Sequence, residues 1–163
     1  MKFWLPLLVV LVFISGCGTY PLNSTATDKQ NLSLDSFSVI KSSDIPYDDL
    51  NASKSYLVYY SDNDEDIKNF NKEYFKLTGE VAPKFEGVMV IAKQGQKNSG
   101  GYGIEVESVS ESNTNTQINL ILKSPGKNCL VTAALTNPFI IIYIPNNYKE
   151  IVFTKKHIQT NCQ

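Results

Sequence analysis

The amino-acid sequence predicts an α+β fold that is mostly β, namely an antiparallel sheet or sandwich with one packed helix at about residues 62–78. Apolar residues recur at helical spacing in that segment, whereas after Pro83 they recur at every second position, as in strands with one buried face. The sequence shows no internal repeat and no second domain. Residues 35–163 are therefore expected to form a single β-rich domain.

The predicted helix has recognisable ends. Ser61 or Asp62 can cap its N-terminus, the acidic residues that follow suit the positive end of the helix dipole, and Gly79 can end it. Its apolar residues form one stripe for packing on a sheet: Ile67, Phe70, Tyr74 and Leu77, with Phe75 beside them.

Two strands are expected before the helix and five after it, two of them in the last part of the domain. Residues 35–41 place Phe37 and Val39 in alternation, and residues 55–61 are rich in β-forming residues. Both segments are expected to be edge or early strands. Residues 87–93 form a third strand. Residues 102–111 and 116–123 are expected to form a hairpin through the turn Asn113-Thr114-Asn115.

The last part of the domain is expected to contain a second hairpin. Residues 139–144 are continuously apolar, which indicates a strand covered on both faces, with the helix as one candidate cover. Asn146-Asn147 then turns the chain into residues 150–154, which are expected to pair with the strand before them.

The N-terminus resembles a bacterial lipoprotein signal peptide over residues 1–17. Lys2 precedes an apolar run that is too short to span a bilayer, and Ile14-Ser15-Gly16-Cys17 resembles a lipobox. The resemblance implies cleavage after residue 16 and lipidation of Cys17, so that acyl chains hold the protein in a membrane. Residues 17–34 are expected to be a flexible tether.

The resemblance to a lipoprotein signal implies that the protein is located in the cell envelope. Gly18 follows the cysteine where lipoproteins retained in the inner membrane often carry Asp, which favours the outer membrane, on its periplasmic or surface face. An ordinary secretory peptide with a chance cysteine is the alternative.

The composition argues against nucleic acid as a partner. All 15 basic residues are lysines, against 16 acidic residues, and removal of the leader with its Lys2 leaves 14 against 16, a net charge of −2. Such a chain has no basic field for nucleic acid and lacks the arginine fork that recognises phosphate.

Assigning Cys17 to lipid leaves Cys129 and Cys162 as an even pair in an oxidising compartment. A disulfide between them would tie down the C-terminal tail, whereas two free thiols are the alternative. Neither cysteine has the basic neighbourhood of an activated nucleophile.

The sequence offers no convincing catalytic, metal or cofactor site. Four carboxylates occupy positions 1, 3, 5 and 12 of an EF-hand loop, but position 6 is Ile67 instead of glycine, and the same segment reads as helix. His157 is the only histidine and reads as part of a solvated strand end. The four carboxylates are Asp62, Asp64, Asp66 and Glu73.

The most distinctive internal segment is Gly95 to Tyr102, which is rich in glycine and ends in an aromatic residue. One interpretation is a glycine-dependent turn with Tyr102 capping the core. The other is a presented loop that binds a partner protein. The candidate partner-binding residues are Lys97, Asn98, Ser99, Gly100, Gly101 and Tyr102.

About residues 83–153 resemble the C-terminal domain of the protease complex subunit PrcB. The resemblance is carried by Ser99-Gly100-Gly101-Tyr102, by Pro125-Gly126 with Cys129, and by Thr132 through Pro138-Phe139, although Asn98 stands where the family often has Pro. It implies a small non-catalytic, exported β-rich domain. In the namesake of the family, this domain belongs to a lipoprotein that associates with and supports a cell-surface protease.

Taken together, these features predict a lipid-anchored accessory or binding subunit of an envelope complex, with a protease as one candidate partner. The alternative is a peptidase inhibitor that uses residues 95–102, which resemble the loop of chagasin-type inhibitors over a few residues. No catalytic residues and no cofactor are expected.

Overall fold

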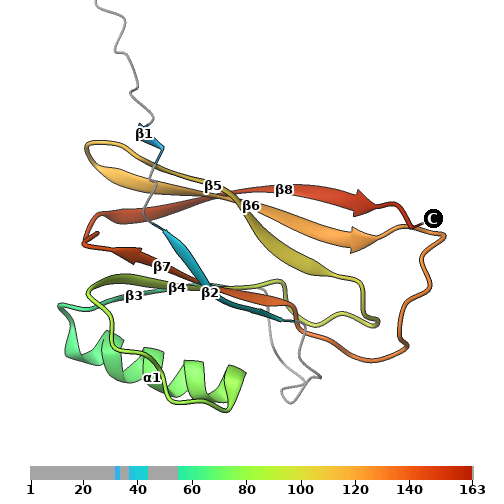
Figure 1. Cartoon of the computed structure of the whole chain (residues 1–163), viewed down its shortest axis with the longest axis horizontal. Helices are drawn as coiled ribbons and strands as arrows, with labels where there is room; N and C mark the ends of the chain where they lie inside the picture. Colours follow the sequence, from blue (N-terminus) through green and yellow to red (C-terminus); the bar gives the residue numbers. More distant parts are fainter. Residues whose placement is uncertain (1–31, 34–36, 44–54, 163) are drawn as a thin grey trace, which may run out of the picture.

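Two four-stranded sheets and one helix form three layers in the computed structural model (Figure 1). The structure describes residues 32–33, 37–43 and 55–162. One sheet has the strand order β1-β5-β6-β8 and the other β2-β7-β4-β3, and α1 covers the outer face of the second sheet. The mostly β, α+β fold class predicted from the sequence is confirmed.

The second sheet is antiparallel throughout and contains β2 (Ser38–Ser43), β3 (Ser55–Tyr60), β4 (Gly87–Lys93) and β7 (Phe139–Pro145). Its central strands are β4 and β7, which pair with each other in the register Val90 with Ile142. The strands β2 and β3 lie at its two edges, as the sequence predicted for both.

The first sheet contains β1 (Leu32–Ser33), β5 (Gly103–Glu111), β6 (Asn115–Pro125) and β8 (Glu150–Thr160). The strands β5 and β6 form the expected hairpin, in which Ser112 Oγ accepts hydrogen bonds from the backbone N–H groups of Thr114 and Asn115. The strand β8 runs parallel to β6 and lies at the other edge of this sheet.

The strand β7 is covered on both faces, which confirms the interpretation of its continuous apolar sequence. Ile140, Ile142 and Ile144 lie in the core between the two sheets. Phe139 and Ile141 lie in a second core beneath the helix. Because both faces of β7 from Phe139 to Ile142 are buried, this part of the strand has no polar alternation.

The helix α1 (Asp64–Thr78) begins at Asn63, whose side-chain oxygen accepts hydrogen bonds from the N–H groups of Glu65 and Asp66. The expected caps Ser61 and Asp62 are therefore wrong. Ser61 Oγ instead accepts a hydrogen bond from Gly87 N, because the turn before the helix abuts the start of β4. The helix ends at Gly79, which has a φ of 70°.

The apolar stripe of α1 packs as predicted through Phe70, Tyr74 and Leu77. Phe70 is fully buried, and its ring lies 5.5 Å from that of Tyr59 and 5.2 Å from that of Phe85. Phe75 does not extend the stripe: it is 59% exposed, because it is one residue beyond Tyr74 and so points away from the sheet.

The predicted second hairpin is wrong, because β7 and β8 belong to different sheets. Both edges of β7 are already paired, one with β2 and one with β4, and no edge remains for β8. The chain crosses to the other sheet, where Ile151 and Phe153 pack into the core between the sheets. The ring of Phe153 stacks on that of Tyr56, with 4.8 Å between the centroids.

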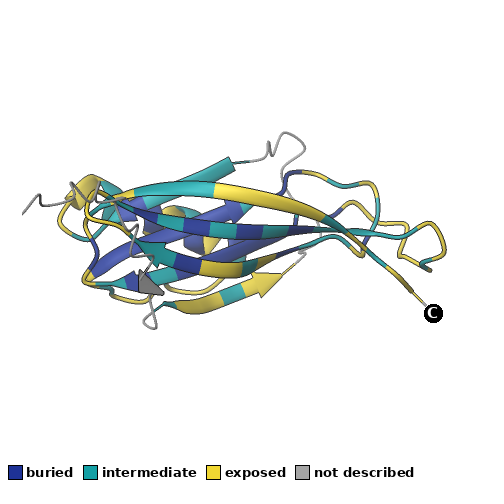
Figure 2. Cartoon of the chain, turned by 90° about the horizontal axis from the view of Figure 1, so that it is seen from above, coloured by how far each residue is buried: buried dark blue, intermediate teal, exposed yellow. Residues whose placement is uncertain are grey.

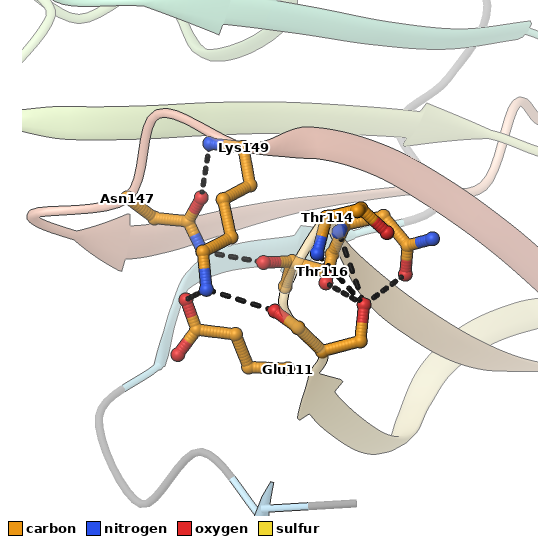
Figure 3. Close-up of polar contacts among 7 residues, drawn as sticks. Glu111, Thr114, Thr116, Asn147 and Lys149 are labelled. Carbon is orange, nitrogen blue, oxygen red and sulfur yellow. Dashed lines mark hydrogen bonds and ion pairs between the residues drawn. The ribbon is translucent and has the colours of Figure 1, made fainter. Parts of the chain in front are cut away.

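A polar cluster fixes this crossing (Figure 3). Asn147 is buried, and its Nδ2 donates a 2.6 Å hydrogen bond to Oγ1 of the fully buried Thr116. Asn147 Oδ1 accepts a hydrogen bond from Lys149 N, and Lys149 Nζ contacts Glu111 at 2.8 Å and the carbonyl of Ser112. These bonds satisfy the polar groups that the crossing buries.

We expect Phe70→Ala to lower the free energy of unfolding by about 3–5 kcal/mol, because it leaves a cavity among three aromatic rings. Phe75→Ala removes the same atoms from an exposed position on the same helix and should change it by less than about 0.5 kcal/mol. Urea denaturation followed by circular dichroism measures both values. Equal losses would contradict the packing of α1.

The protein should lose stability at high pH through Tyr59. Burial, and then the charges of Glu73 and Asp66, raise the pKa of Tyr59 from 10.0 to about 12. Since the folded state favours the neutral hydroxyl, this stabilisation is complete below pH 10 and is lost as the pH rises through about 12. In Tyr59→Phe, the free energy of unfolding should fall less steeply over that interval. An unchanged slope in urea titrations at several pH values would refute this.

Candidate functional site

The predicted binding loop lies at one end of the sandwich, where two connections cross between the sheets. Residues 94–102 link β4 to β5, and residues 126–138 link β6 to β7. We refer to these two segments as the loop pair. Figure 1 places them at the end of the molecule where the C-terminus also lies.

The two loops are hydrogen-bonded to each other along their length. Lys97 and Thr136 exchange backbone hydrogen bonds of 2.8 and 3.0 Å. Gly100 N donates to the carbonyl of Thr132 at 3.0 Å, and Thr136 Oγ1 donates to the carbonyl of Ser99 at 2.9 Å. Residues 94–102 therefore do not form an independent projecting loop.

Buried polar side chains hold the base of the loop pair against both sheets. Gln94 N donates to the carbonyl of Pro138 at 2.8 Å, and Gln94 Nε2 donates to the carbonyl of Lys123 on the other sheet at 3.2 Å. Gln94 is 7% exposed and Thr136 is 5% exposed. Because these bonds are shielded from water, they restrict the loops more than surface bonds would.

A disulfide joins Cys129 to Cys162, just beyond the end of β8. Cys129 N donates to the carbonyl of Gly126, and Gly126 N donates to the carbonyl of Thr160. The second loop is thus attached to the first sheet by covalent and hydrogen bonds at the same place. The expected even pair of cysteines is the pair that the structure joins.

The predicted loop residues differ in their surroundings. Gly100 is buried, Gly101 and Asn98 are exposed, and the rest are intermediate. The Nζ of Lys97 lies 5.3 Å from the centroid of the Tyr102 ring, a cation–π contact. Tyr102 is not a member of either core cluster, and it remains available at the surface.

The most exposed apolar side chains of the loop pair lie on residues 126–138, which the sequence analysis did not consider as a binding loop. Leu130 is 104% exposed, Val131 41% and Leu135 40%. We call these three residues the apolar strip; Ala133 and Ala134 between them are also exposed. Figure 2 shows exposed residues gathered in the loops near the C-terminus.

A signal for this strip was present in the sequence. Residues 130–135 contain five apolar residues in six positions, with neither helical nor strand periodicity, between the turn residues Gly126 and Pro138. An apolar run in a segment of turn residues indicates surface that is not used for the core. The sequence alone does not show that the disulfide and the first loop, and not the leucines, hold residues 126–138 in place.

The structure places the other candidate residues from the sequence on α1 and β8. Asp64, Asp66 and Glu73 lie on α1, and Asp66 Oδ2 accepts a hydrogen bond from Tyr60 N, so this segment is a helix start and not a calcium loop. His157 is exposed on β8. Within residues 37–43 and 55–162, no group of three or more metal-ligating side chains is gathered.

Cys17, residues 1–16 and nearly all of the tether lie outside the described residues, and the lipid anchor remains a prediction from sequence. Among the helices that the structure describes, none has the length and apolarity to cross a membrane.

We expect Gly101→Ala to destabilise the loop pair. Gly101 has a φ of 83°, and a Cβ atom there would lie 3.0 Å from Val131 Cγ1 and 3.1 Å from Pro125 Cβ. The substitution should cost about 1–3 kcal/mol of the free energy of unfolding. Gly103→Ala is the matched control, because nothing lies within 4 Å of its Cβ position. Thermal denaturation compares the two, and equal midpoints would argue against a strained Gly101.

Comparison with known proteins adds one match. The family model described as PrcB C-terminal matches residues 88–145, from β4 to the end of β7. The match includes the whole loop pair and excludes α1 and β8. No curated protein and no solved structure matches the chain. The resemblance to the PrcB C-terminal domain, expected over about residues 83–153, is thereby confirmed for residues 88–145.

Proposed function

We propose that this protein is a non-catalytic accessory subunit of a cell-envelope complex, anchored by lipid on Cys17, and that its partner is a protease. The observation that carries this proposal is the apolar strip, three exposed apolar side chains on a loop that is held by a disulfide and by a second loop. Exposed apolar surface on a preorganised backbone is typical of protein-binding sites.

The family match supports the choice of partner. The strip and both loops lie inside residues 88–145, the region that matches the PrcB C-terminal family, and that family is named for a subunit of a protease complex. A domain of this kind supplies binding surface to an enzyme and needs no catalytic residues of its own.

The position of the N-terminal strand is compatible with anchoring. The strand β1 pairs with Ser110 and Glu111, at the end of β5 that lies away from the loop pair (Figure 1). The chain that leads from Cys17 therefore enters the domain at one end, and the apolar strip lies at the other. A tethered domain of this shape can present the strip away from the anchoring membrane, for which the outer membrane is favoured.

The loop geometry favours docking over the inhibitor alternative. An inhibitor loop of the chagasin type has to enter a cleft, whereas residues 95–102 are hydrogen-bonded to residues 126–138 and contain the buried Gly100. The two loops are joined to each other by backbone hydrogen bonds, which suits contact with a partner's surface better than entry into a cleft.

Immunoprecipitation of the lipidated protein from envelopes after mild crosslinking tests the proposal. We expect an envelope protein, with a protease as the first candidate, to be recovered together with the wild type. Cys17→Ser should abolish palmitate labelling and release the protein from the membrane fraction. Recovery of the wild type as a free monomer at native expression would sink the proposal.

Peptidase assays on the recovered complex distinguish an accessory subunit from a peptidase inhibitor. An accessory subunit should leave the peptidase activity unchanged or raise it. Inhibition that Tyr102→Ala relieves would identify the inhibitor function instead.

A further inference from the structure

The apolar strip lies outside both hydrophobic cores, although Val131 lies against Gly101. Leu130, Val131 and Leu135 are absent from both core clusters. The loop keeps its conformation through Gly100 and Thr132, Lys97 and Thr136, and the Cys129–Cys162 disulfide, all of which lie beside the strip. Little conformational entropy is then lost when the strip meets a partner.

The charged side chains on the two loops are all of one sign. Residues 94–102 contain Lys97, residues 126–138 contain Lys127, and neither loop contains an aspartate or a glutamate. Lys127 is exposed, and Lys97 lies over the Tyr102 ring. The nearest carboxylate along β5 is Glu105, which is paired with Lys123.

The opposite end of the molecule has the opposite charge. The turn into α1 and the connections that meet it there are joined by the hydrogen bonds Ser61 N to Gly87 O and Asn146 N to Glu86 O. Carboxylates outnumber lysines in the segments at this end, where Lys149 is paired with Glu111. The carboxylates are Asp62, Asp64, Glu65, Asp66, Glu86, Glu111 and Glu150. The protein therefore carries an acidic end at the strand β1 and a basic, apolar end at the loop pair.

This arrangement argues against two occupants of the strip. A second copy of the chain that docked through its own loop pair would bring two pairs of lysines together around the leucines, and like charges repel. For the strip to contact the anchoring membrane, the domain would have to turn toward that membrane the end that lies away from β1. A protein surface with carboxylates around an apolar centre has neither disadvantage.

We propose that the apolar strip docks on a segment of the partner protein that is apolar at its centre and flanked by aspartate or glutamate residues, which face Lys97 and Lys127. This proposal rests on the proposed function and specifies the chemistry of the partner. The leucines supply most of the affinity, and the lysines select the partner and speed the encounter.

The test uses the full lipidated chain in nanodiscs and two fluorescent peptides with the same leucine-rich centre, one flanked by glutamates and the other by lysines. Fluorescence anisotropy should show preferential binding of the glutamate-flanked peptide. The preference should shrink as ionic strength rises from about 0.01 M to about 1 M, over which the screening length falls from about 30 Å to about 3 Å.

Substitutions separate the apolar and the charged contributions. Leu130→Ser with Leu135→Ser should weaken binding at least about tenfold, whereas Phe75→Ser removes an exposed aromatic residue on α1 and should leave binding unchanged. Lys97→Glu with Lys127→Glu should reverse the preference toward the lysine-flanked peptide. The control Lys68→Glu with Lys72→Glu alters exposed lysines on α1 and should preserve it.

Three outcomes would overturn the proposal: equal binding of the two peptides, no detectable binding of either, or binding that is insensitive to the substitutions of Leu130 and Leu135. Sedimentation of the delipidated protein with phosphatidylglycerol vesicles, lost in the double leucine variant, would assign the strip to a lipid surface instead. None of these outcomes bears on whether a protein is recovered from envelopes, so failure of this proposal and failure of the proposed function can be told apart.

Discussion

The burial of β4 and β7 on both faces is the constraint on which the rest of the structure depends. These two strands supply apolar residues to the core between the sheets and to the core beneath α1. Each fully buried aliphatic side chain contributes about 1.5–3 kcal/mol relative to an exposed one. Because β7 pairs with β2 on one side and β4 on the other, β8 cannot pair with β7. The chain instead crosses at Asn147, and β8 pairs in parallel with β6.

The same constraint creates the candidate site. The chain leaves β4 for the other sheet and returns from that sheet into β7, and both crossings lie at one end of the sandwich. The two loops that make these crossings come close enough for Lys97 and Thr136 to exchange backbone hydrogen bonds. Since hydrogen bonds and a disulfide hold the loops, the side chains of Leu130 and Leu135 are not needed for the core and remain exposed.

The two ends of the molecule differ in charge and polarity, and in the proposed function only the loop-pair end contacts the partner. The end that receives β1 carries buried polar bonds and many carboxylates, and the end with the loop pair carries two lysines around exposed leucines. In the proposed assembly, lipid on Cys17 restricts the domain to the membrane surface, and the loop pair meets the partner. Restriction to a surface raises the effective concentration of the two proteins for each other without any new contact.

The sequence by itself determined the elements whose signals are local. Phe70, Tyr74 and Leu77 recur at helical spacing and define α1, the turn at Asn113 defines the β5–β6 hairpin, and the run from Phe139 to Ile144 shows a strand without a solvent face. The order and spacing of three short motifs, from Ser99 to Phe139, predicted the resemblance to the PrcB C-terminal domain that is confirmed for residues 88–145. Only the tertiary structure decided that β8 joins β6, that residues 94–102 are bound to residues 126–138, and that Leu130 is exposed. Each of these depends on which strand edges are still free and on contacts between residues far apart in the chain, and no local pattern of polarity carries that information.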